Sequence, residues 1–460
     1  MPVFTYRSPM PVSRQRLWAW HASPGAFARL APPWDPPRIV AQEGDFAHRR
    51  VTMEVGPLQM RWVAQHHDAV PGEVFHDRMV SGPFAAWDHA HRFEEGPAGA
   101  SVLVDHLEVE LPGGAVGRAL GEPLLRRMLD RMFAFRHRRT LEDLVSLGAI
   151  APLRIAITGA TGLVGSHLVP YLQGGGHTVH RLVRRAPAAG SADIQWDPAT
   201  GTIDAAALEG VDAVIHLAGE NVGARWSPAR RAAILESRVK GTALLARTLA
   251  GLARKPRVFV SASAVGFYGY AGGDQAFDDT AAQGGGYLAE VCRAWEAAAE
   301  PARAAGIRVV HPRIGVVLSA EGGALGKQLL PAQMGAGGPI GTGRQWLSWI
   351  ALDDVLAGLL HLVTHDDLAG PVNLVAPHPV PQRTFARTLG HVLGRPAVLP
   401  LPAFAVRAAF GEMGEEVLLG GQRVVPTALL ASGYAFFRPD LEGALRAELG
   451  RGASVPPAAT

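Results

Sequence analysis

Apolar and polar positions follow different patterns along the chain, and each pattern predicts a different kind of domain. In the first 147 residues, short stretches alternate apolar and polar positions. Residues 102–111, for example, carry Leu103 and Leu107 on one face and His106 and Glu108 on the other. Such alternation predicts strands with one buried face. The expected elements are strands at 3–7, 51–55, 58–64 and 102–111, a helix at 13–30 and a long helix at 123–144. This order of elements predicts an α+β domain.

In residues 153–375, short apolar runs alternate with longer helical stretches. That alternation predicts a parallel sheet with crossover helices, which is the Rossmann-type, doubly wound α/β fold. A linker at 148–152, punctuated by glycine and proline, precedes it. We expect residues 376–449 to form a small, mostly helical region. Residues 450–460 are rich in proline and alanine, and we expect them to be a disordered tail. The expected strands lie at 154–158, 178–183, 213–217, 257–262 and 308–313.

Composition narrows the class of protein. A chain of 460 residues is too long to fold around one hydrophobic core, so several domains are expected. Its residues are 48% hydrophobic and 18% charged, which is typical of a globular protein. A net charge of +3 gives no electrostatic case for a nucleic-acid partner. We expect no membrane span, because no apolar run reaches about 18 residues, and no signal peptide. The single cysteine, Cys292, forms no intrachain disulfide, so a cytoplasmic location is expected.

The most specific motif is a glycine loop between a strand and a helix. Gly159, Gly162 and Gly165 are spaced G-x-x-G-x-x-G directly after the apolar strand 154–158. This context predicts a dinucleotide site: the first glycine allows a tight turn, the second admits a pyrophosphate, and the third lets helix and strand pack closely. The helix N-terminus favours the phosphates. The predicted contacts are Thr158, Gly159, Ala160, Thr161, Gly162, Leu163, Val164 and Gly165.

Arg184 and Arg185 follow the second strand of this domain, about 20 residues after the glycine loop. An acidic residue at this place binds the ribose 2′-hydroxyl of NAD, whereas an arginine suits the 2′-phosphate of NADP. We therefore predict NADP(H) as the cofactor. The alternative is that both arginines are solvated loop residues.

Further motifs resemble a known family. The chain carries H-L-A-G at 216–219, S-A-S-A-V-G-F-Y-G at 261–269 and G-T-G-R-Q at 341–345, followed by D-D-V at 353–355. Residues 153 to 449 resemble the atypical short-chain dehydrogenases of the epimerase/dehydratase family that end in a domain of unknown function and are sometimes labelled cell-division inhibitors. The first 147 residues resemble the helix-grip fold of START and polyketide-cyclase-like domains, which enclose an apolar cavity. The resemblance adds Leu217, Ala218, Gly219 and Ser261 to the expected cofactor contacts.

The same resemblance indicates the catalytic residues and a departure among them. Ser263 and Tyr287 match the serine and tyrosine of short-chain dehydrogenases, but Val291 stands where the family has a lysine that lowers the pKa of the tyrosine. Two cations are candidates to replace that lysine, Arg238 and Lys327; for each, a packing or surface role is the alternative. Without a cation, forming a tyrosinate at pH 7 costs about 4 kcal/mol.

The expected function is that of an NADP(H)-dependent oxidoreductase or epimerase-like enzyme acting on a small, apolar carbonyl or alcohol. Leu347 replaces an arginine that nucleotide-sugar enzymes use, which argues against a UDP-sugar substrate. Two alternatives stay open: a non-catalytic NADP-binding sensor or scaffold, and a lipid or polyketide carrier that uses the N-terminal cavity. His89 and His91 share a strand face, but without a third ligand in the pattern we predict no metal. The partners, the substrate and the oligomeric state are not encoded in these patterns.

Overall fold

The computed structural model describes residues 1–188 and 190–452. The chain forms two compact units. Unit 1 contains Met1–Ile150, Pro170–Gly176 and the described residues from Leu449 onward, and unit 2 contains Ala151–Val169 and His177–Glu448. Residues 453–460, most of the expected tail, lie outside the described residues. No helix within the described residues is long and apolar enough to cross a membrane.

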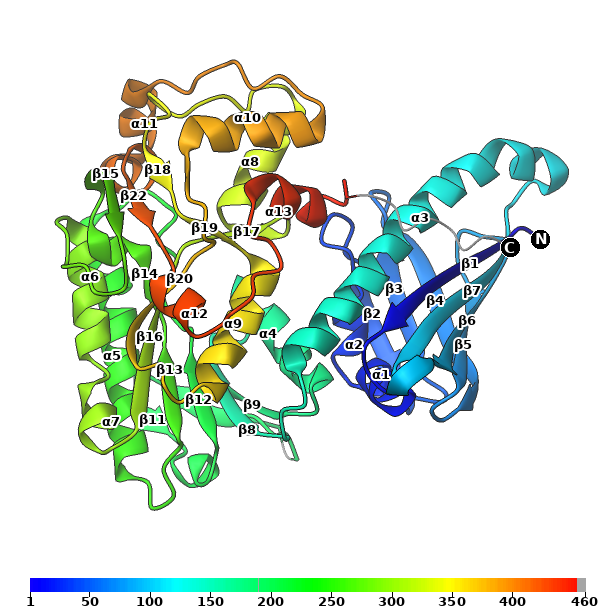
Figure 1. Ribbon diagram of the computed structural model, residues 1–460, viewed down its shortest axis with the longest axis horizontal. Coiled ribbons are helices and arrows are strands. Elements are labelled where there is room, and N and C mark those ends of the chain that lie inside the picture. The colour runs from blue at the N-terminus through cyan, green and yellow to red at the C-terminus, as the bar shows by residue number, and fades with distance from the viewer. Residues whose placement is uncertain (189, 453–460) are drawn as a thin grey trace. The chain divides into compact units, whose positions relative to one another are not determined.

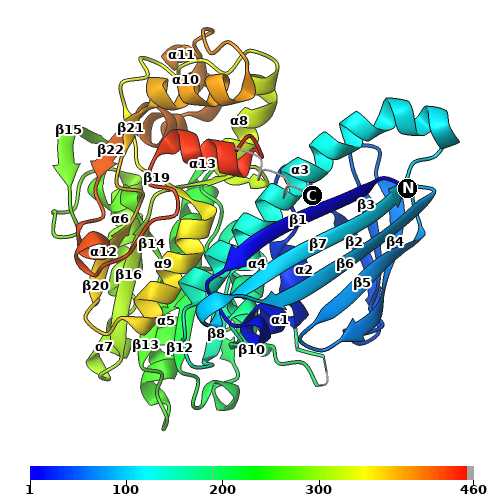
Figure 2. The same cartoon turned by 45° about the vertical axis from the view of Figure 1, so that its right-hand side comes forward.

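Unit 1 is an antiparallel sheet with a long helix, as the α+β pattern predicted. Its seven strands are ordered β1-β7-β6-β5-β4-β3-β2, and Figure 2 shows them beside the long helix α3. Phe4 and Leu107 from the sheet pack against Leu129 and Phe133 from α3, so the helix closes one face of the sheet. The strands are β1 (Val3–Met10), β2 (Arg38–Glu43), β3 (Arg50–Val55), β4 (Met60–Val70), β5 (Val74–Ser81), β6 (Ala86–Glu95) and β7 (Ser101–Glu110), and the helices are α1 (Arg14–Ala22), α2 (Ala26–Arg29) and α3 (Gly114–Leu147).

Two helix boundaries in unit 1 differ from the expectation. The helix expected at 13–30 begins as predicted, with Ser13 accepting a hydrogen bond from the Arg16 amide, but it ends at Ala22 and resumes at Ala26. Pro24 lies in the break, and it lacks the amide hydrogen that a continuing helix needs. The long helix starts at Gly114 rather than at 123, and Pro123 lies inside it. Proline at the start of a helix is common, and this preference misplaced the predicted boundary.

Unit 2 has the doubly wound arrangement that the alternating pattern predicted. The sheet is ordered β11-β10-β9-β8-β12-β13-β16-β14, with β20 paired to β16, and its central strands run parallel. Helices cover both faces (Figure 1). The strands are β8 (Arg154–Thr158), β9 (Thr178–Val183), β10 (Ile194–Asp197), β11 (Thr202–Ile203), β12 (Ala213–His216), β13 (Val258–Ser261), β14 (Ser263–Ala264), β16 (Arg308–Ile314) and β20 (Gly370–Leu374). The helices of this part are α4 (Leu163–Gly174), of which the residues from Pro170 onward belong to unit 1, α5 (Pro228–Gly251), α6 (Tyr287–Ala297), α7 (Glu300–Ala304), α8 (Gly323–Gln333) and α9 (Leu352–Thr364).

The core of unit 2 lies between the sheet and its helices. Val214 and Phe259 from neighbouring strands pack against Leu245 and Leu249 of α5, all fully buried. The region after β20 is mainly helical, as expected, with two short strands that pair with strands of the Rossmann domain. It consists of β21 (Val380–Pro381), α10 (Gln382–Leu393), α11 (Ala403–Phe410), β22 (Gly421–Val424), α12 (Thr427–Ala431) and α13 (Leu441–Glu448), and the paired segments are β18 (Trp346–Leu347) and β15 (Ala271–Phe277). A further pair joins β17 (Val316–Ser319) and β19 (Trp349–Ala351).

Candidate functional site

The glycine loop between β8 and α4 has the geometry that a dinucleotide site requires. Gly159 has a φ of 70°, in the left-handed region. A Cβ atom at Gly165 would lie 2.2 Å from the Gly159 carbonyl oxygen, so only glycine lets the helix begin this close to the strand. The Gly162 amide donates to the same oxygen at 3.0 Å. Thr161 and Gly162 are exposed at the turn. Backbone amides and a helix N-terminus without bulky side chains therefore fit a pyrophosphate.

Thr158 fixes the neighbouring loop rather than presenting its side chain to a ligand. Its hydroxyl oxygen accepts hydrogen bonds from the amides of Leu217 and Ala218, at 3.1 and 3.2 Å. The Thr158 hydroxyl must then donate to Nδ1 of His216, 2.6 Å away. Burial lowers the pKa of His216 to about 3, so its imidazole is neutral and its Nε2 donates to Thr242 at 3.0 Å. This chain of bonds holds residues 217–219 against the glycine loop.

Gly159 and Gly219 mark two close approaches at this edge of the sheet. A Cβ atom at Gly159 would lie 2.9 Å from the amide nitrogen of Ala218, and one at Gly219 would lie 3.1 Å from the guanidinium carbon of Arg238. The Arg238 guanidinium donates to the carbonyls of Glu220 and Ile234 and lies over the ring of Trp295. Arg238 therefore packs against residues 219–220 and fixes the loop that contains the expected cofactor contacts Leu217, Ala218 and Gly219.

The other predicted cofactor residues are placed as follows. Arg184 and Arg185 follow β9, which is next to β8 in the parallel sheet, and both are exposed. Ser261 ends β13 and is fully buried; within the described residues its hydroxyl has no hydrogen-bond partner. Ligands of doubly wound sheets bind outside the carboxyl ends of the strands, where the glycine loop and these residues lie. The arrangement leaves the two guanidinium groups available to an anion.

Ser263 lies two residues beyond the end of β13, and its hydroxyl is held by a carboxylate that the sequence motifs did not reveal. Its Oγ donates to Oε1 of Glu296 at 2.6 Å. Arg313 of β16 binds both oxygens of Glu296 at 2.9 Å and also contacts the hydroxyl of Tyr268 at 3.0 Å. The Tyr268 hydroxyl donates onward to Asn373 at 2.7 Å. One feature of the sequence does indicate such a network: Arg313 is a charged residue in the otherwise mostly apolar strand 308–314, and a buried arginine needs a partner.

Tyr287 is the first residue of α6, and its hydroxyl faces a different partner. It donates to the backbone carbonyl of Arg231 at 2.5 Å, and the ring lies 4.2 Å from the Arg231 guanidinium. No hydrogen bond among the described residues joins Tyr287 to Ser263. Burial raises the pKa of Tyr287, and the charges of Arg231 and Arg238 oppose that rise.

The two candidate substitutes for the missing lysine lie in different surroundings. Val291, at the lysine position, is buried with Tyr287 in an apolar cluster. Arg238 is mostly buried and acts on the pKa of Tyr287, as described above. Lys327 of α8 donates to the carbonyl of Gly223 at 2.8 Å and is exposed. Arg231, which the sequence motifs did not single out, is a further cation beside Tyr287.

A second candidate site is a cavity of about 1310 Å³ inside unit 1. Aromatic and aliphatic side chains form much of its wall, and the polar lining includes Asp77, His89 and His91. A cavity of this size is large enough for a drug-sized ligand. Its apolar lining residues include Val51, Met53, Trp62, Phe75, Trp87 and Phe135.

Family models and relatives match both units. Residues 155–375 match the NAD dependent epimerase/dehydratase family, residues 401–448 match a domain of unknown function (DUF1731), and residues 10–135 match the polyketide cyclase / dehydrase and lipid transport family. The Mycobacterium bovis protein "Epimerase family protein Mb2239" is 42% identical over 294 residues, which are 63% of this chain and 96% of that protein. Human "Epimerase family protein SDR39U1" is 36% identical over 298 residues, covering 64% of this chain and 99% of that protein.

Two solved structures are similar to this chain. A nucleoside-diphosphate sugar epimerase from Corynebacterium glutamicum superimposes with a TM-score of 0.81 at 32% identity, covering 99% of this chain and 91% of the other. Human SDR39U1 (isoform 2), solved with NADPH, superimposes with a TM-score of 0.58 at 34% identity, covering 65% of this chain and 99% of the other. The resemblance found in the sequence is thereby confirmed. The chain belongs to the NAD-dependent epimerase/dehydratase family, in the SDR39U1-like group that ends in DUF1731, and it carries an N-terminal polyketide cyclase/lipid transport domain.

Proposed function

We propose that the protein is an NADP(H)-dependent oxidoreductase that acts on a small, apolar carbonyl or alcohol. The observation that carries the proposal is the placement of three features at the carboxyl edge of one parallel sheet: the glycine loop, the arginines after β9, and Ser263 after β13. In this proposal the loop would hold the cofactor, the arginines would select NADP(H), and the Ser263 hydroxyl would bind the substrate oxygen, all at this one edge of the sheet.

NADP(H) is favoured over NAD(H) by two exposed cations and by one relative. Arg184 and Arg185 stand where an acidic residue would bind the ribose of NAD, and guanidinium groups can grip a phosphate through paired hydrogen bonds. The human relative, 34% identical, was solved with NADPH. When bound, the cofactor would supply or accept the hydride.

Ser263 is the residue that we assign to the substrate oxygen. Because its hydroxyl hydrogen points to Glu296, its lone pairs are available to accept a hydrogen bond from a substrate alcohol. A proton released by that alcohol could pass through Ser263 to Glu296, which Arg313 holds in place. In the reverse direction the same path returns a proton to the oxygen of a carbonyl substrate.

Tyr287 is the second candidate for proton transfer, because it matches the family's catalytic tyrosine. To act, its hydroxyl would have to leave the carbonyl of Arg231. Arg238 and Arg231 would stabilise the phenolate in place of the missing lysine, since nearby cations lower the pKa of a phenol. The alternative is a non-catalytic NADP-binding sensor or scaffold, in which neither Ser263 nor Tyr287 moves a proton. Two observations favour it: the Tyr287 hydroxyl already donates to a backbone carbonyl, and Val291 occupies the lysine position.

A panel assay separates these functions. The full chain would be incubated with NADPH and a panel of aliphatic and aromatic aldehydes and ketones, and in a separate reaction with NADP⁺ and UDP-glucose to test the nucleotide-sugar alternative. We expect NADPH oxidation with an apolar carbonyl. Ser263→Ala should lower kcat by about 100-fold or more with an unchanged Kd for NADPH, as removal of a group that acts on the developing charge does. Turnover of UDP-glucose alone, or rates equal in the wild type and Ser263→Ala, would contradict the proposal.

A further inference from the structure

Three ionisable side chains of unit 1 meet at the wall of its cavity. Asp77 of β5 lies directly across from His89 of β6 in the sheet, and His91 is two residues further along β6 on the same face. Oδ2 of Asp77 lies 3.3 Å from Nδ1 of His89 and 3.1 Å from Nε2 of His91. All three side chains line the cavity, and both histidines are buried.

A second carboxylate holds both histidines from the opposite side. Oδ1 of Asp105, on β7, lies 2.8 Å from Nε2 of His89 and 2.7 Å from Nδ1 of His91. The other oxygen of Asp105 lies 2.6 Å from Nε2 of His137 on α3, and Nδ1 of His137 contacts Ser8 at 2.8 Å. Asp105 and His137 are buried behind the three side chains that line the cavity.

The two histidines and Asp77 can direct three lone pairs at one point. A neutral imidazole has one N–H group and one acceptor nitrogen. Nε2 of His89 hydrogen-bonds Asp105, which leaves Nδ1 of a neutral His89 facing Asp77 with its lone pair. In His91, Nε2 hydrogen-bonds Asp77, and Nδ1 lies 2.7 Å from Asp105 without a hydrogen bond. Moving the ring proton of His91 to Nδ1 would give Asp105 a second donor and turn the Nε2 lone pair to the same point, where a metal ion would bind all three groups. Arg136 interacts electrostatically with Asp77 and donates from Nε to the Leu30 carbonyl, and among the described residues no ion pair joins it to Asp77, whose ion pairs are with His89 and His91.

We propose that Asp77, His89 and His91 bind a divalent transition-metal ion such as Zn²⁺ or Fe²⁺ at the wall of the cavity. Two imidazoles and one carboxylate on one face of the sheet can together bind such an ion through three ligand atoms. The other coordination positions of the ion then stay open. The open positions would face the cavity, where an apolar ligand could bind the metal through a carbonyl, enolate or carboxylate oxygen. Asp105 orients both histidines, as outer carboxylates do in metal sites.

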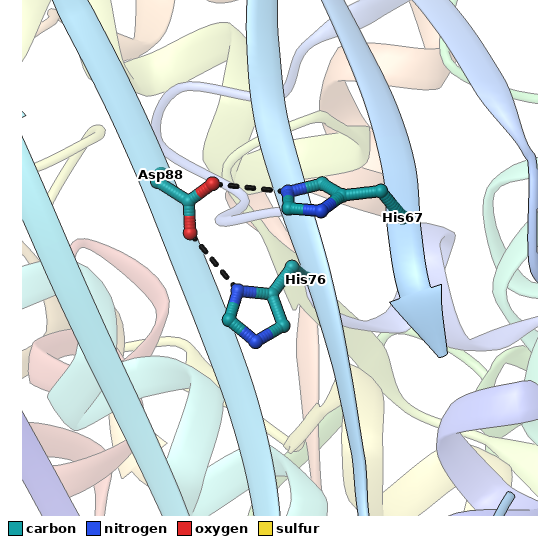
Figure 3. A group of neighbouring side chains, drawn as sticks. All are labelled: His67, His76 and Asp88. Carbon is teal, nitrogen blue, oxygen red and sulfur yellow. Dashed lines mark hydrogen bonds and ion pairs between the residues drawn. The ribbon is translucent and has the colours of Figure 1, made fainter. Parts of the chain in front are cut away.

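The outer face of the same sheet offers an internal control. Figure 3 shows His67, His76 and Asp88, which come from β4, β5 and β6. Asp88 lies 3.0 Å from a ring nitrogen of each histidine, much as in the inner group. These side chains are only half-buried, and the second nitrogen of His67 meets the exposed Asp68 instead of a buried carboxylate. The two groups thus have the same residue types but differ in burial and in outer support.

Metal content tests the assignment. The full chain would be stripped with a chelator, reloaded with Co²⁺ and measured for bound metal and for the visible absorption of Co²⁺. We expect the wild type to bind about one equivalent of Co²⁺ tightly. Asp77→Asn and His91→Ala should each weaken Co²⁺ binding by tenfold or more, whereas the control His76→Ala should bind Co²⁺ like the wild type. Asp105→Asn should weaken binding by about 10- to 100-fold. Near-UV circular dichroism of each variant would show whether it remains folded.

Open coordination positions have their own readout. Adding acetohydroxamate, an oxygen-donor probe, to the wild-type Co²⁺ form should shift its visible spectrum, which needs no variant. Absence of tight uptake by the wild type, equal uptake by folded His91→Ala, or loss of the metal only in His76→Ala would each overturn the proposal. If the wild type takes up no metal tightly, then shared protons, rather than a metal ion, join Asp77 to the two histidines.

Discussion

The glycine loop and the proposed catalytic end of unit 2, which contains Ser263 and Tyr287, are built in different ways. The loop is shaped by backbone geometry: Gly159, Gly162 and Gly165 are close in sequence, and the neighbours of Gly159 and Gly165 leave no room for a side chain. At the catalytic end, Ser263 depends on Glu296 and Tyr287 depends on Arg231, which are 33 and 56 residues away in sequence. The turn of the glycine loop is therefore set mainly by residues close in sequence, whereas the hydroxyls of Ser263 and Tyr287 are held by distant partners. Changes in the two regions should have separable effects.

The largest effect is expected in the loop. Gly165→Val should lower NADPH affinity by at least about 100-fold, because its Cβ would meet the Gly159 carbonyl at 2.2 Å and displace the helix that faces the phosphates. Titration calorimetry would measure the affinity. Gly251→Ala is the control, since a Cβ there meets nothing within 4 Å, and it should bind NADPH like the wild type. Tight NADPH binding by a folded Gly165→Val would show that the loop is not the site.

At the catalytic end, the expected effect is on stability as well as on rate. Glu296→Gln removes the charge that Arg313 binds through two hydrogen bonds and leaves that arginine uncompensated in a site where its side chain is 4% exposed. We expect a loss of about 3 kcal/mol in the free energy of unfolding. Urea denaturation followed by tryptophan fluorescence would measure it. The comparison predicts that NADPH affinity changes little in this variant; a parallel loss of affinity would mean that the two regions are coupled.

A smaller effect is expected at the cofactor-selective position. Replacing Arg184 and Arg185 by alanine should reduce NADPH affinity by about 10- to 100-fold, the loss of one or two charge-assisted hydrogen bonds, without changing NADH affinity. Calorimetric titration with both cofactors would show it. A double substitution with lysine should retain part of the preference. Equal affinities of the wild type for NADPH and NADH would contradict the NADP(H) proposal.

The smallest effect concerns pH. His216 stays neutral in the folded protein because burial lowers its pKa to about 3, whereas an unfolded histidine titrates near 6.5. Below about pH 6.5 the unfolded state takes up a proton that the folded state does not, so acidification favours unfolding. Between pH 6.5 and 5.5 this amounts to about 1 kcal/mol from His216. The protection factors of the β8 and β12 amides, corrected for the intrinsic exchange rate at each pH, should therefore fall over this range, and unchanged protection factors would argue against the neutral bridge between Thr158 and Thr242.

The sequence predicted what short-range patterns encode. The α+β and Rossmann architectures followed from the patterns of apolar positions, the helix-grip fold was a resemblance in the order of elements, and the glycine loop followed from spacing. The partners of Ser263, Tyr287 and Thr158 were not predictable in this way, because each belongs to another strand or helix that only the fold brings near. The same reason explains why His89 and His91 seemed to lack a third ligand: Asp77 is on the neighbouring strand, and no spacing along one strand reveals it.

Hydride transfer is the most direct test of the proposed function. The full chain would be incubated with NADPH deuterated at C4, in separate reactions for the two faces of the nicotinamide, and with a cell metabolite extract, and products would be analysed by mass spectrometry. An oxidoreductase predicts a product that carries one deuterium from one face only, formed by the wild type and not by Ser263→Ala. Tight binding of NADPH with no labelled product, and no oxidation of the cofactor, would contradict the account and favour the NADP-binding scaffold.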